Sequence, residues 1–226
     1  MAENILEKII KNKKKKIDSF KKSISIENLK IKIDENKSFI NFKEKIENNE
    51  SKDKISIIAE IKKASPSAGI IIENYDPVNI ADVYNNNKAT CLSVLTEEDF
   101  FLGNLLHISK IKQKINLPIL CKDFFIDKFQ VYLARSYGAD AILIILAGVS
   151  DEVANILYEE AKKLDITGYI ENLNNPNHVK AIIQGNLDSL NQLIILAKIG
   201  PPLALVKKIN KEKIILKKNF TKFSIK

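Results

Sequence analysis

Four charged residues follow short apolar runs in the sequence, and their types suit acid–base chemistry. Glu60 and Lys62 lie two positions apart at the end of the first run, so on a β-strand both side chains would point to the same side. Lys122 ends the third run, and Glu171 follows the fifth. Two lysines and two carboxylates around one cavity would perturb one another's pKa values, as acid–base catalysis at neutral pH requires. The alternative is that all four are solvated charges at strand ends.

A serine-containing loop follows the first of these charged positions. Residues 65–69 read Ser-Pro-Ser-Ala-Gly, and Ser65 carries the first hydroxyl. Free hydroxyls and backbone N–H groups in such a loop can hold an anionic group. An ordinary turn explains the same composition equally well, so the residues alone leave both interpretations open.

Hydropathy indicates the elements that must position these residues. Apolar runs without alternation, as expected of strands buried on both faces, occupy residues 57–61, 89–95, 117–120, 141–147 and 168–170. Amphipathic segments, which we predict to be helices, lie between them at residues 77–86, 105–115, 128–137 and 152–164. Strands and helices that alternate with a period of about 28 residues predict a parallel α/β fold.

Two parallel architectures compete, an open doubly wound sheet and a (β/α)8 barrel. In a barrel, functional groups gather at the carboxyl ends of the strands. Charged residues end strand after strand here, and no G-x-G-x-x-G follows the first run, as a dinucleotide-binding sheet would require. The sequence therefore predicts an α/β protein of the (β/α)8 TIM-barrel class.

The first 50 residues differ in character from the rest of the chain. They are polar and charged, and apolar residues such as Ile9 and Ile17 recur at helix-like spacings. A second short helix is expected within residues 39–46. We interpret residues 1–50 as an N-terminal helical extension and residues 51–226 as the barrel domain. The alternative for the extension is a partly disordered basic tail.

Length is a difficulty for a complete barrel. This class of domain usually needs about 250 residues, and the five predicted strands end near residue 172 of a 226-residue chain. Residues 211–216 suit a late strand, whereas residues 193–197 suit either a strand or a buried helix. We therefore expect the barrel to be incomplete at its C-terminal end, with the last strand or strands missing.

Composition argues against several classes of protein. Hydrophobic residues make up 45% of the chain, which suffices for a core, and no apolar run is long enough for a transmembrane helix. The lysine-rich N-terminus lacks the apolar segment of a signal peptide. Cys91 and Cys121 form no C-x-x-C, which argues against a disulfide scaffold or a zinc cluster and favours a reducing cytoplasm.

The formal net charge of +8 has two interpretations. One is a nucleic-acid partner that contacts the lysine tract of Lys11 and residues 13–16. The other is a lysine-biased composition, because Arg135 is the single arginine of the chain and specific readers of phosphate and guanine rely on arginine. We favour the second interpretation, and we expect no nucleic-acid partner and no membrane partner.

Several motifs resemble those of the indole-3-glycerol phosphate synthase family. They are, in chain order, IIAEIKKASPS at residues 57–67, YDP at 75–77, SVLTE at 93–97, FFLG at 100–103, LPILCKDF at 117–124 and GADAIL at 138–143. Residues 5–16 also resemble the family's N-terminal helix with its lysine-rich turn. Because the resemblance runs in order from about residue 4 to residue 173, the chain is identified as a member of this family.

The resemblance implies an enzyme of tryptophan biosynthesis. The family converts 1-(2-carboxyphenylamino)-1-deoxyribulose 5-phosphate to indole-3-glycerol phosphate with loss of carbon dioxide and water, and it uses no metal and no organic cofactor. The implied partner is a small phosphorylated substrate derived from anthranilate. The implied form is a cytoplasmic monomer with carboxy-lyase activity.

The resemblance also implies a role for each matched residue. Lys122 would be the general acid that protonates the substrate carbonyl during ring closure, and Glu171 would transfer protons during the later dehydration. Lys62 would bind the carboxylate of the substrate and assist acid catalysis, with Glu60 positioning it. The implied substrate-binding residues are Ser65, Phe100 and Phe124, of which the two phenylalanines would wall the aromatic part of the pocket.

The resemblance weakens after about residue 173. The family's Asn-Asn-Arg motif, Ser-Glu-Ser-Gly motif and glycine-containing phosphate loop have no clear counterpart, and Asn191 is a loosely aligned candidate for the first. Three hypotheses follow: an active synthase, a catalytically impaired remnant of the barrel without the phosphate site, and a lysine-rich nucleic-acid-binding protein.

Overall fold

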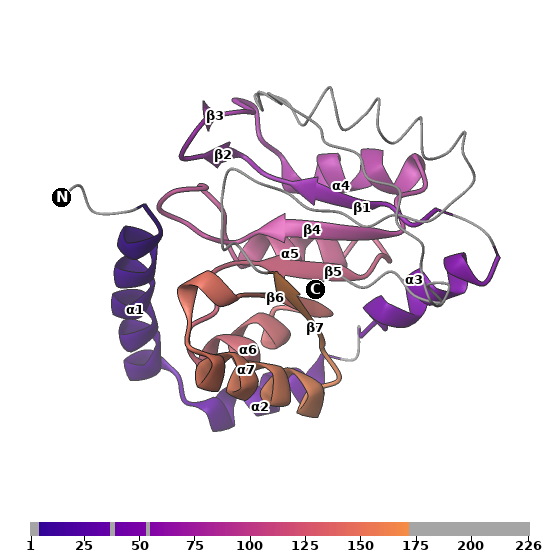
Figure 1. Cartoon of the computed structure of the whole chain (residues 1–226). Helices are drawn as coiled ribbons and strands as arrows, with labels where there is room; N and C mark the ends of the chain where they lie inside the picture. The colour runs from indigo at the N-terminus through magenta and orange to yellow at the C-terminus, as the bar shows by residue number, and fades with distance from the viewer. Residues whose placement is uncertain (1–4, 37–38, 53–54, 172–226) are drawn as a thin grey trace, which may run out of the picture. The chain divides into compact units, whose positions relative to one another are not determined.

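A computed structural model describes residues 5–36, 39–52 and 55–171 of the chain. Three helices come first, and strands that alternate with helices follow (Figure 1). The elements are α1 (Ile5–Ser23), α2 (Ile26–Glu35), α3 (Phe42–Glu50), β1 (Ile58–Ile61), β2 (Ala64–Ser65), β3 (Gly69–Ile70), α4 (Pro77–Asn86), β4 (Cys91–Leu95), α5 (Leu106–Lys112), β5 (Ile119–Lys122), α6 (Lys128–Ser136), β6 (Ala141–Ile145), the 3₁₀ turn η1 (Leu146–Gly148), α7 (Asp151–Lys163) and β7 (Thr167–Glu171).

The central feature is a five-stranded sheet in the order β1-β4-β5-β6-β7. All four strand pairings are parallel, and each strand pairs with the next large strand of the chain. The order does not reverse, as it does in a doubly wound sheet, and this matches the wall of a (β/α) barrel. The five predicted strands and the four predicted helices between them are confirmed, with ends that differ by a few residues.

A short antiparallel hairpin interrupts this alternation directly after β1. Strand β2 pairs with β3 so that Ala64 lies opposite Ile70 and Ser65 opposite Gly69. Gly69 has a φ of +65°, a conformation that glycine adopts without steric penalty. The sequence predicted a loop here, and strands of two residues are too short for a hydropathy pattern to indicate them.

Three helices of the sheet layer begin at side chains that cap their first N–H groups. Asp76 caps α4 immediately before Pro77, and Ser150 caps α7. Asp127 and Gln130 form a reciprocal capping box at the start of α6. These side chains accept hydrogen bonds from N–H groups that have no partner within a helix. They therefore set the residue at which each helix begins and the preceding loop ends.

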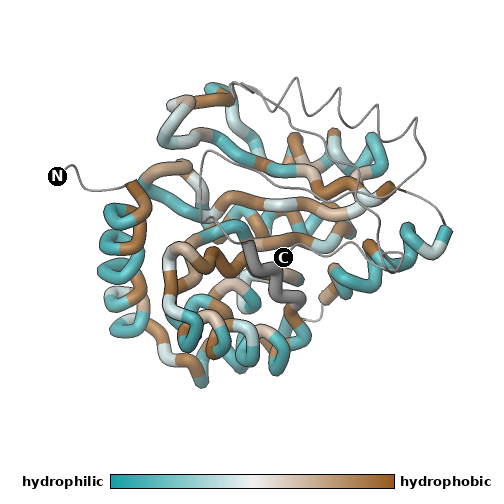
Figure 2. Tube along the Cα trace, viewed as in Figure 1, coloured by the Kyte–Doolittle hydropathy of each residue, from teal (hydrophilic) through white to brown (hydrophobic). Residues whose placement is uncertain are grey.

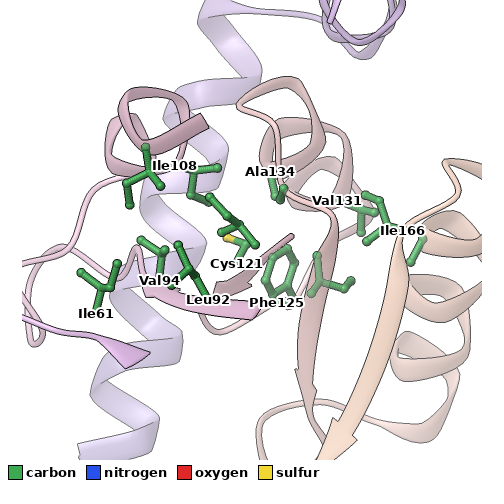
Figure 3. Close-up of a cluster of buried hydrophobic side chains, with 14 of the residues drawn as sticks. Ile61, Leu92, Val94, Ile108, Cys121, Phe125, Val131, Ala134 and Ile166 are labelled. Atoms are coloured by element: carbon green, nitrogen blue, oxygen red, sulfur yellow. The ribbon is translucent and has the colours of Figure 1, made fainter. Parts of the chain in front are cut away.

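Two hydrophobic layers cover the two faces of the sheet. The larger lies between the sheet and helices α4 to α7, and Figure 3 labels Ile61, Leu92, Val94, Ile108, Cys121, Phe125, Val131, Ala134 and Ile166 within it. The smaller lies on the opposite face and contains Phe42, Cys91, Leu120, Ala141, Leu143 and Ile145. Both faces are buried in β4, β5 and β6, and these strands therefore carry unbroken apolar runs instead of alternating ones.

The helical character predicted for the N-terminal residues is confirmed, and α2 and α3 contact different parts of the sheet layer. Helix α3 inserts Phe42 into the smaller hydrophobic layer, and its Asn49 donates a hydrogen bond of 3.1 Å to Thr90 just before β4. Helix α2 packs Leu29 against α6. The sequence predicted that this helix begins near residue 39. Helix α3 begins at residue 42 instead, because Asn41 caps it.

Helix α1 lies at the opposite end of the sheet from α3, beside the carboxyl ends of the strands (Figure 1). Its residues Ile9 and Ile17 are buried, as the helix-like spacing predicted. Its Ile10 lies so close to Gly148, after β6, that a Cβ at that glycine would be 3.2 Å from the Cδ1 atom of Ile10. In Figure 2 the hydrophobic stretches of α1 face the sheet and the hydrophilic ones face away.

The chain divides into two units, Met1–Leu173 and Asn174–Lys226. The second unit lies outside the described residues, as do the expected elements at residues 193–197 and 211–216. Among the described strands, β1 and β7 are the two edges of the sheet. The division into an extension of residues 1–50 and a barrel domain stays a prediction. In the part of the chain that the structure describes, none of the helices is long and apolar enough to cross a membrane.

A buried ion pair fixes the amino ends of β5 and β6. Asp140 is fully buried and accepts hydrogen bonds from the N–H groups of Ile119 at 2.8 Å and Ile40 at 2.9 Å. The Nζ atom of Lys112 lies 2.5 Å from the same carboxylate. Burial raises the pKa of Asp140 and lowers that of Lys112, so burying the pair is itself unfavourable. Removal of one partner from such a pair is strongly destabilising, because the charge of the other partner stays buried.

We predict that Asp140→Ala lowers the free energy of unfolding by about 3–5 kcal/mol, because Lys112 and two backbone N–H groups lose this acceptor. Urea unfolding at pH 7, followed by circular dichroism, measures the change. The control is Asp34→Ala at an exposed position of α2, which we expect to change the same free energy by less than about 0.5 kcal/mol. Equal effects of the two substitutions would contradict the prediction.

Candidate active site

Glu60 on β1 is hydrogen-bonded to both of the predicted lysines. Its Oε1 atom accepts a bond of 2.7 Å from Nζ of Lys62, and its Oε2 atom accepts one of 2.6 Å from Nζ of Lys122. Glu60 lies in register with Ser93 of β4, and Lys122 at the end of β5 lies in register with Leu95 of β4. The structure thus brings three of the four predicted charged residues together at the carboxyl ends of the strands. We call Glu60, Lys62 and Lys122 the lysine–glutamate triad.

The charges of the triad suit an anionic ligand. One carboxylate and two ammonium groups leave it with a net positive charge. Partial burial raises the pKa of Glu60, but the hydrogen bonds and charges of Lys122 and Lys62 outweigh burial and hold this pKa below its ordinary value. Glu60 is therefore ionised at neutral pH. The three side chains are 29% to 37% exposed, so a ligand can reach them.

The geometry of the triad leaves proton donors available. Each ammonium group has three N–H bonds, and each lysine gives one of them to Glu60. The remaining donors of Lys62 and Lys122 come from two different strands and can address two different oxygen atoms of one ligand. The triad can thus bind a carboxylate at one lysine while the other donates to a carbonyl oxygen.

Glu171, the fourth predicted charged residue, ends β7 at the same end of the sheet. Its backbone lies in register with Ile145 of β6, which neighbours β5. Its side chain is outside the described part of the structure, so its participation stays a prediction. Asn191 lies outside the described residues.

Ser65 lies in the hairpin that follows the triad's first two residues. Its hydroxyl accepts a hydrogen bond of 3.2 Å from the N–H of Ala68 and lies 3.4 Å from the hydroxyl of Ser67. These contacts are those of the ordinary turn that composition left open. A contact between Ser65 and a substrate stays a prediction.

The aromatic ring that contacts Phe124 belongs to Phe101. The two ring centroids are 6.3 Å apart. Phe124 also packs against the smaller hydrophobic layer. The resemblance implied Phe100 as a wall residue and did not indicate its neighbour Phe101, whose ring makes this contact. The role of Phe100 stays a prediction.

The loop after β4 is organised around the buried carboxylate of Glu97, a role that the sequence did not predict. Its oxygens accept hydrogen bonds from the N–H groups of Asp99 at 3.2 Å, Phe100 at 2.7 Å and Phe101 at 3.2 Å. The loop closes at Gly103, where a Cβ would lie 2.4 Å from the carbonyl oxygen of Leu95. A single side chain therefore fixes the backbone that presents Phe101.

Thiol and metal chemistry find little support near the site. Burial raises the pKa of Cys91 and of Cys121 to about 12, so neither is poised as a thiolate nucleophile. Within the described residues, no group of three or more His, Cys, Asp or Glu side chains is arranged to hold a metal ion.

Comparison with known proteins identifies the chain's relatives. The family model described as indole-3-glycerol phosphate synthase matches residues 6–189 and so extends past residue 173, near which the motif resemblance ends. The relatives that the chain resembles include three proteins named indole-3-glycerol phosphate synthase. The one from Trichodesmium erythraeum is 39% identical over 74% of this chain and 56% of the relative. Those from Prochlorococcus marinus strains MIT 9301 and AS9601 are 42% and 44% identical over 81% and 75% of this chain, and over 61% and 57% of their own lengths.

This chain thus spans less than two thirds of the length of these relatives. The family match and the parallel sheet together confirm the predicted fold class, a TIM barrel preceded by helices, of which the described residues supply five adjacent strands. A second family model, described as acylphosphatase, matches residues 154–225 and covers less than half of the chain. Where the two matches overlap in the described structure, the residues form most of α7 and the strand β7 of the barrel sheet.

We predict that Glu60→Gln destabilises the protein at neutral pH by up to about 1 kcal/mol, because two partly exposed ion pairs are lost. The folded-state pKa of Glu60 is lowered, so its stabilising effect is complete above the unfolded-state pKa and disappears as pH falls through the folded-state value. Urea unfolding of both proteins at several pH values between 7 and 3.5 measures the difference, which should shrink with acidification. A difference that stays constant over this range would refute the assignment.

Proposed function

The chain belongs to the indole-3-glycerol phosphate synthase family, and we propose that it closes the indole ring. The substrate would be 1-(2-carboxyphenylamino)-1-deoxyribulose 5-phosphate, and the products indole-3-glycerol phosphate, carbon dioxide and water. The observation that carries the proposal is the lysine–glutamate triad, in which one ionised carboxylate holds two ammonium groups at the carboxyl ends of β1 and β5. Both a carboxylate and a carbonyl oxygen of the substrate need such donors.

Ring closure uses the two lysines in different ways. Lys62 binds the substrate's carboxylate, and Lys122 protonates the carbonyl oxygen as the aromatic carbon that bears the carboxylate attacks the carbonyl carbon. This forms one carbon–carbon bond and converts the carbonyl into a hydroxyl. Glu60 keeps both ammonium groups in place through its two oxygens, and the bonds of 2.7 Å and 2.6 Å support this positioning role.

Loss of carbon dioxide and water follows from the same intermediate. The carboxylate leaves as carbon dioxide, and its bonding electron pair restores the aromatic ring. The new hydroxyl then takes up a proton and leaves as water, while a proton departs from the neighbouring carbon to form the double bond of the indole. We assign this proton transfer to Glu171, whose backbone ends β7 at the same end of the sheet.

The aromatic part of the substrate needs an apolar wall beside these charges. Phe124, which follows Lys122 by two residues, packs against the smaller hydrophobic layer and contacts the ring of Phe101. We propose Phe124 and Phe100 as wall residues, with Phe101 joining them, and Ser65 as a further substrate contact.

The alternatives lead to different outcomes in one assay. A catalytically impaired barrel would show no turnover by the purified 226-residue chain. A nucleic-acid-binding protein would need free lysines in the tract of α1, whereas Lys13 and Lys16 are engaged in ion pairs with acidic residues of the same chain. We further propose a cytoplasmic monomer that requires no cofactor, and the two free, buried cysteines agree with a reducing compartment.

We predict that the 226-residue chain forms indole-3-glycerol phosphate and that Lys122→Ala lowers kcat by about 100-fold or more, because a general acid typically contributes 10²- to 10⁴-fold. Fluorescence of the indole product on addition of the ribulose phosphate substrate measures turnover.

The control for this variant is Lys110→Ala, which removes an exposed lysine of α5 and should leave kcat within about twofold of the unaltered chain. A kcat for Lys122→Ala equal to that of Lys110→Ala would remove Lys122 from the acid role. Absence of turnover in the unaltered chain would favour the impaired barrel.

A further inference from the structure

Helix α1 contributes a buried lysine to the carboxyl ends of two strands. The side chain of Lys13 is 8% exposed, and its Nζ atom lies 2.7 Å from Oδ1 of Asp123 and 4.0 Å from Oε1 of Glu97. Asp123 directly follows Lys122 of the triad, and Glu97 follows the end of β4 by two residues. One cation from outside the barrel therefore faces two buried carboxylates next to the site.

Each of these carboxylates fixes a segment that lines the site. Asp123 accepts a hydrogen bond of 2.8 Å from the N–H of Phe124 and one of 2.7 Å from the hydroxyl of Thr96. Glu97 accepts three bonds from the loop that carries Phe101, as described above. Side chains that are 9% and 1% exposed cannot be compensated by water.

The two segments are also joined to each other. The rings of Phe101 and Phe124 are in contact, and the N–H of Thr96 donates a bond of 3.1 Å to the carbonyl oxygen of Lys122. A displacement of either carboxylate would therefore move the aromatic wall together with the backbone of Lys122. Loss of the cation would leave both buried carboxylates without the positive charge that they share and favour that displacement.

We infer that Lys13 is a positioning residue of the active site, acting from α1 through Asp123 and Glu97 on the segments that carry Lys122, Phe124 and Phe101. It does not reach the triad and is no catalytic residue. The part of this inference that concerns turnover rests on the proposed function, whereas the part that concerns the two segments does not.

Hydrogen exchange, followed by mass spectrometry, tests the positioning without any need for activity. We expect Lys13→Met to accelerate exchange about tenfold in peptides that cover residues 97–104 and 122–126, because their N–H groups bond to carboxylates that have lost their cation. Lys13→Arg should retain the protection, since it retains the charge. The matched control is Lys15→Met, an exposed lysine of the same helix, which should leave both peptides unchanged. Unchanged exchange in Lys13→Met would overturn the inference.

A second variant keeps the test decisive if Lys13→Met does not fold. Lys13→Met combined with Asp123→Asn removes the cation together with one of the two buried charges, and Glu97 alone is then left uncompensated. We expect faster exchange in residues 97–104 of this double variant, with residues 122–126 closer to the unaltered chain. Unaltered exchange in residues 97–104 would again overturn the inference.

Steady-state kinetics separate positioning from general stability. For Lys13→Met we expect kcat to fall about 10- to 100-fold, with KM within about threefold, because small misplacements of reacting groups act on the chemical step. Lys13→Arg should restore kcat. A kcat for Lys13→Met equal to that of Lys15→Met would overturn the inference. If the unaltered chain shows no turnover, the proposed function fails, and the exchange measurement still decides the role of Lys13.

Discussion

A parallel sheet covered on both faces leaves one place for charged chemistry, and the site follows from this constraint. Strands β4, β5 and β6 are buried between helices on one side and a second apolar layer on the other, so charged side chains are tolerated only where these strands end. The parallel direction of all four pairings then brings those ends to a common edge. Glu60 and Lys122 meet because β4 holds β1 and β5 at a fixed separation, even though the two residues are 62 positions apart in the sequence.

Sharing one carboxylate between two lysines sets the character of the site. Two ammonium groups without a carboxylate between them would repel each other. One lysine paired with one glutamate would be neutral and would not attract an anion. With Glu60 between them, Lys62 and Lys122 are both oriented while one positive charge remains over. The lowered pKa of Glu60 has the same origin, since each lysine favours its ionised form. Orientation and anion affinity thus come from a single side chain.

The sequence was informative wherever one residue's environment follows from its own strand. The apolar runs predicted the five strands, and the positions of Glu60, Lys62 and Lys122 at the ends of two of those runs predicted the triad. The residues of the aromatic wall were harder to predict, because Phe100 and Phe101 are neighbours in a loop. Hydrogen bonds to Glu97 set the direction of that loop, and the spacing of residues in the sequence does not indicate them. Lys13 was counted with the lysine tract, because its burial depends on acids more than 80 positions away. Long-range charge pairing of this kind leaves no local pattern.

Several lysines of α1 form ion pairs with acidic residues in the loops at the carboxyl ends of the strands. The loops after β4 and β5 carry Glu97, Glu98, Asp99, Asp123 and Asp127, which alone would make the mouth of the barrel negative and repel a carboxylate or a phosphate. Lys13, Lys16 and Lys21 of α1 lie within 4.0 Å of these five groups. Their charges offset much of that field, and the triad adds one net positive charge at the same end of the sheet. The N-terminal helix therefore shapes the electrostatics of the site as well as its packing, although it adds no residue to the triad.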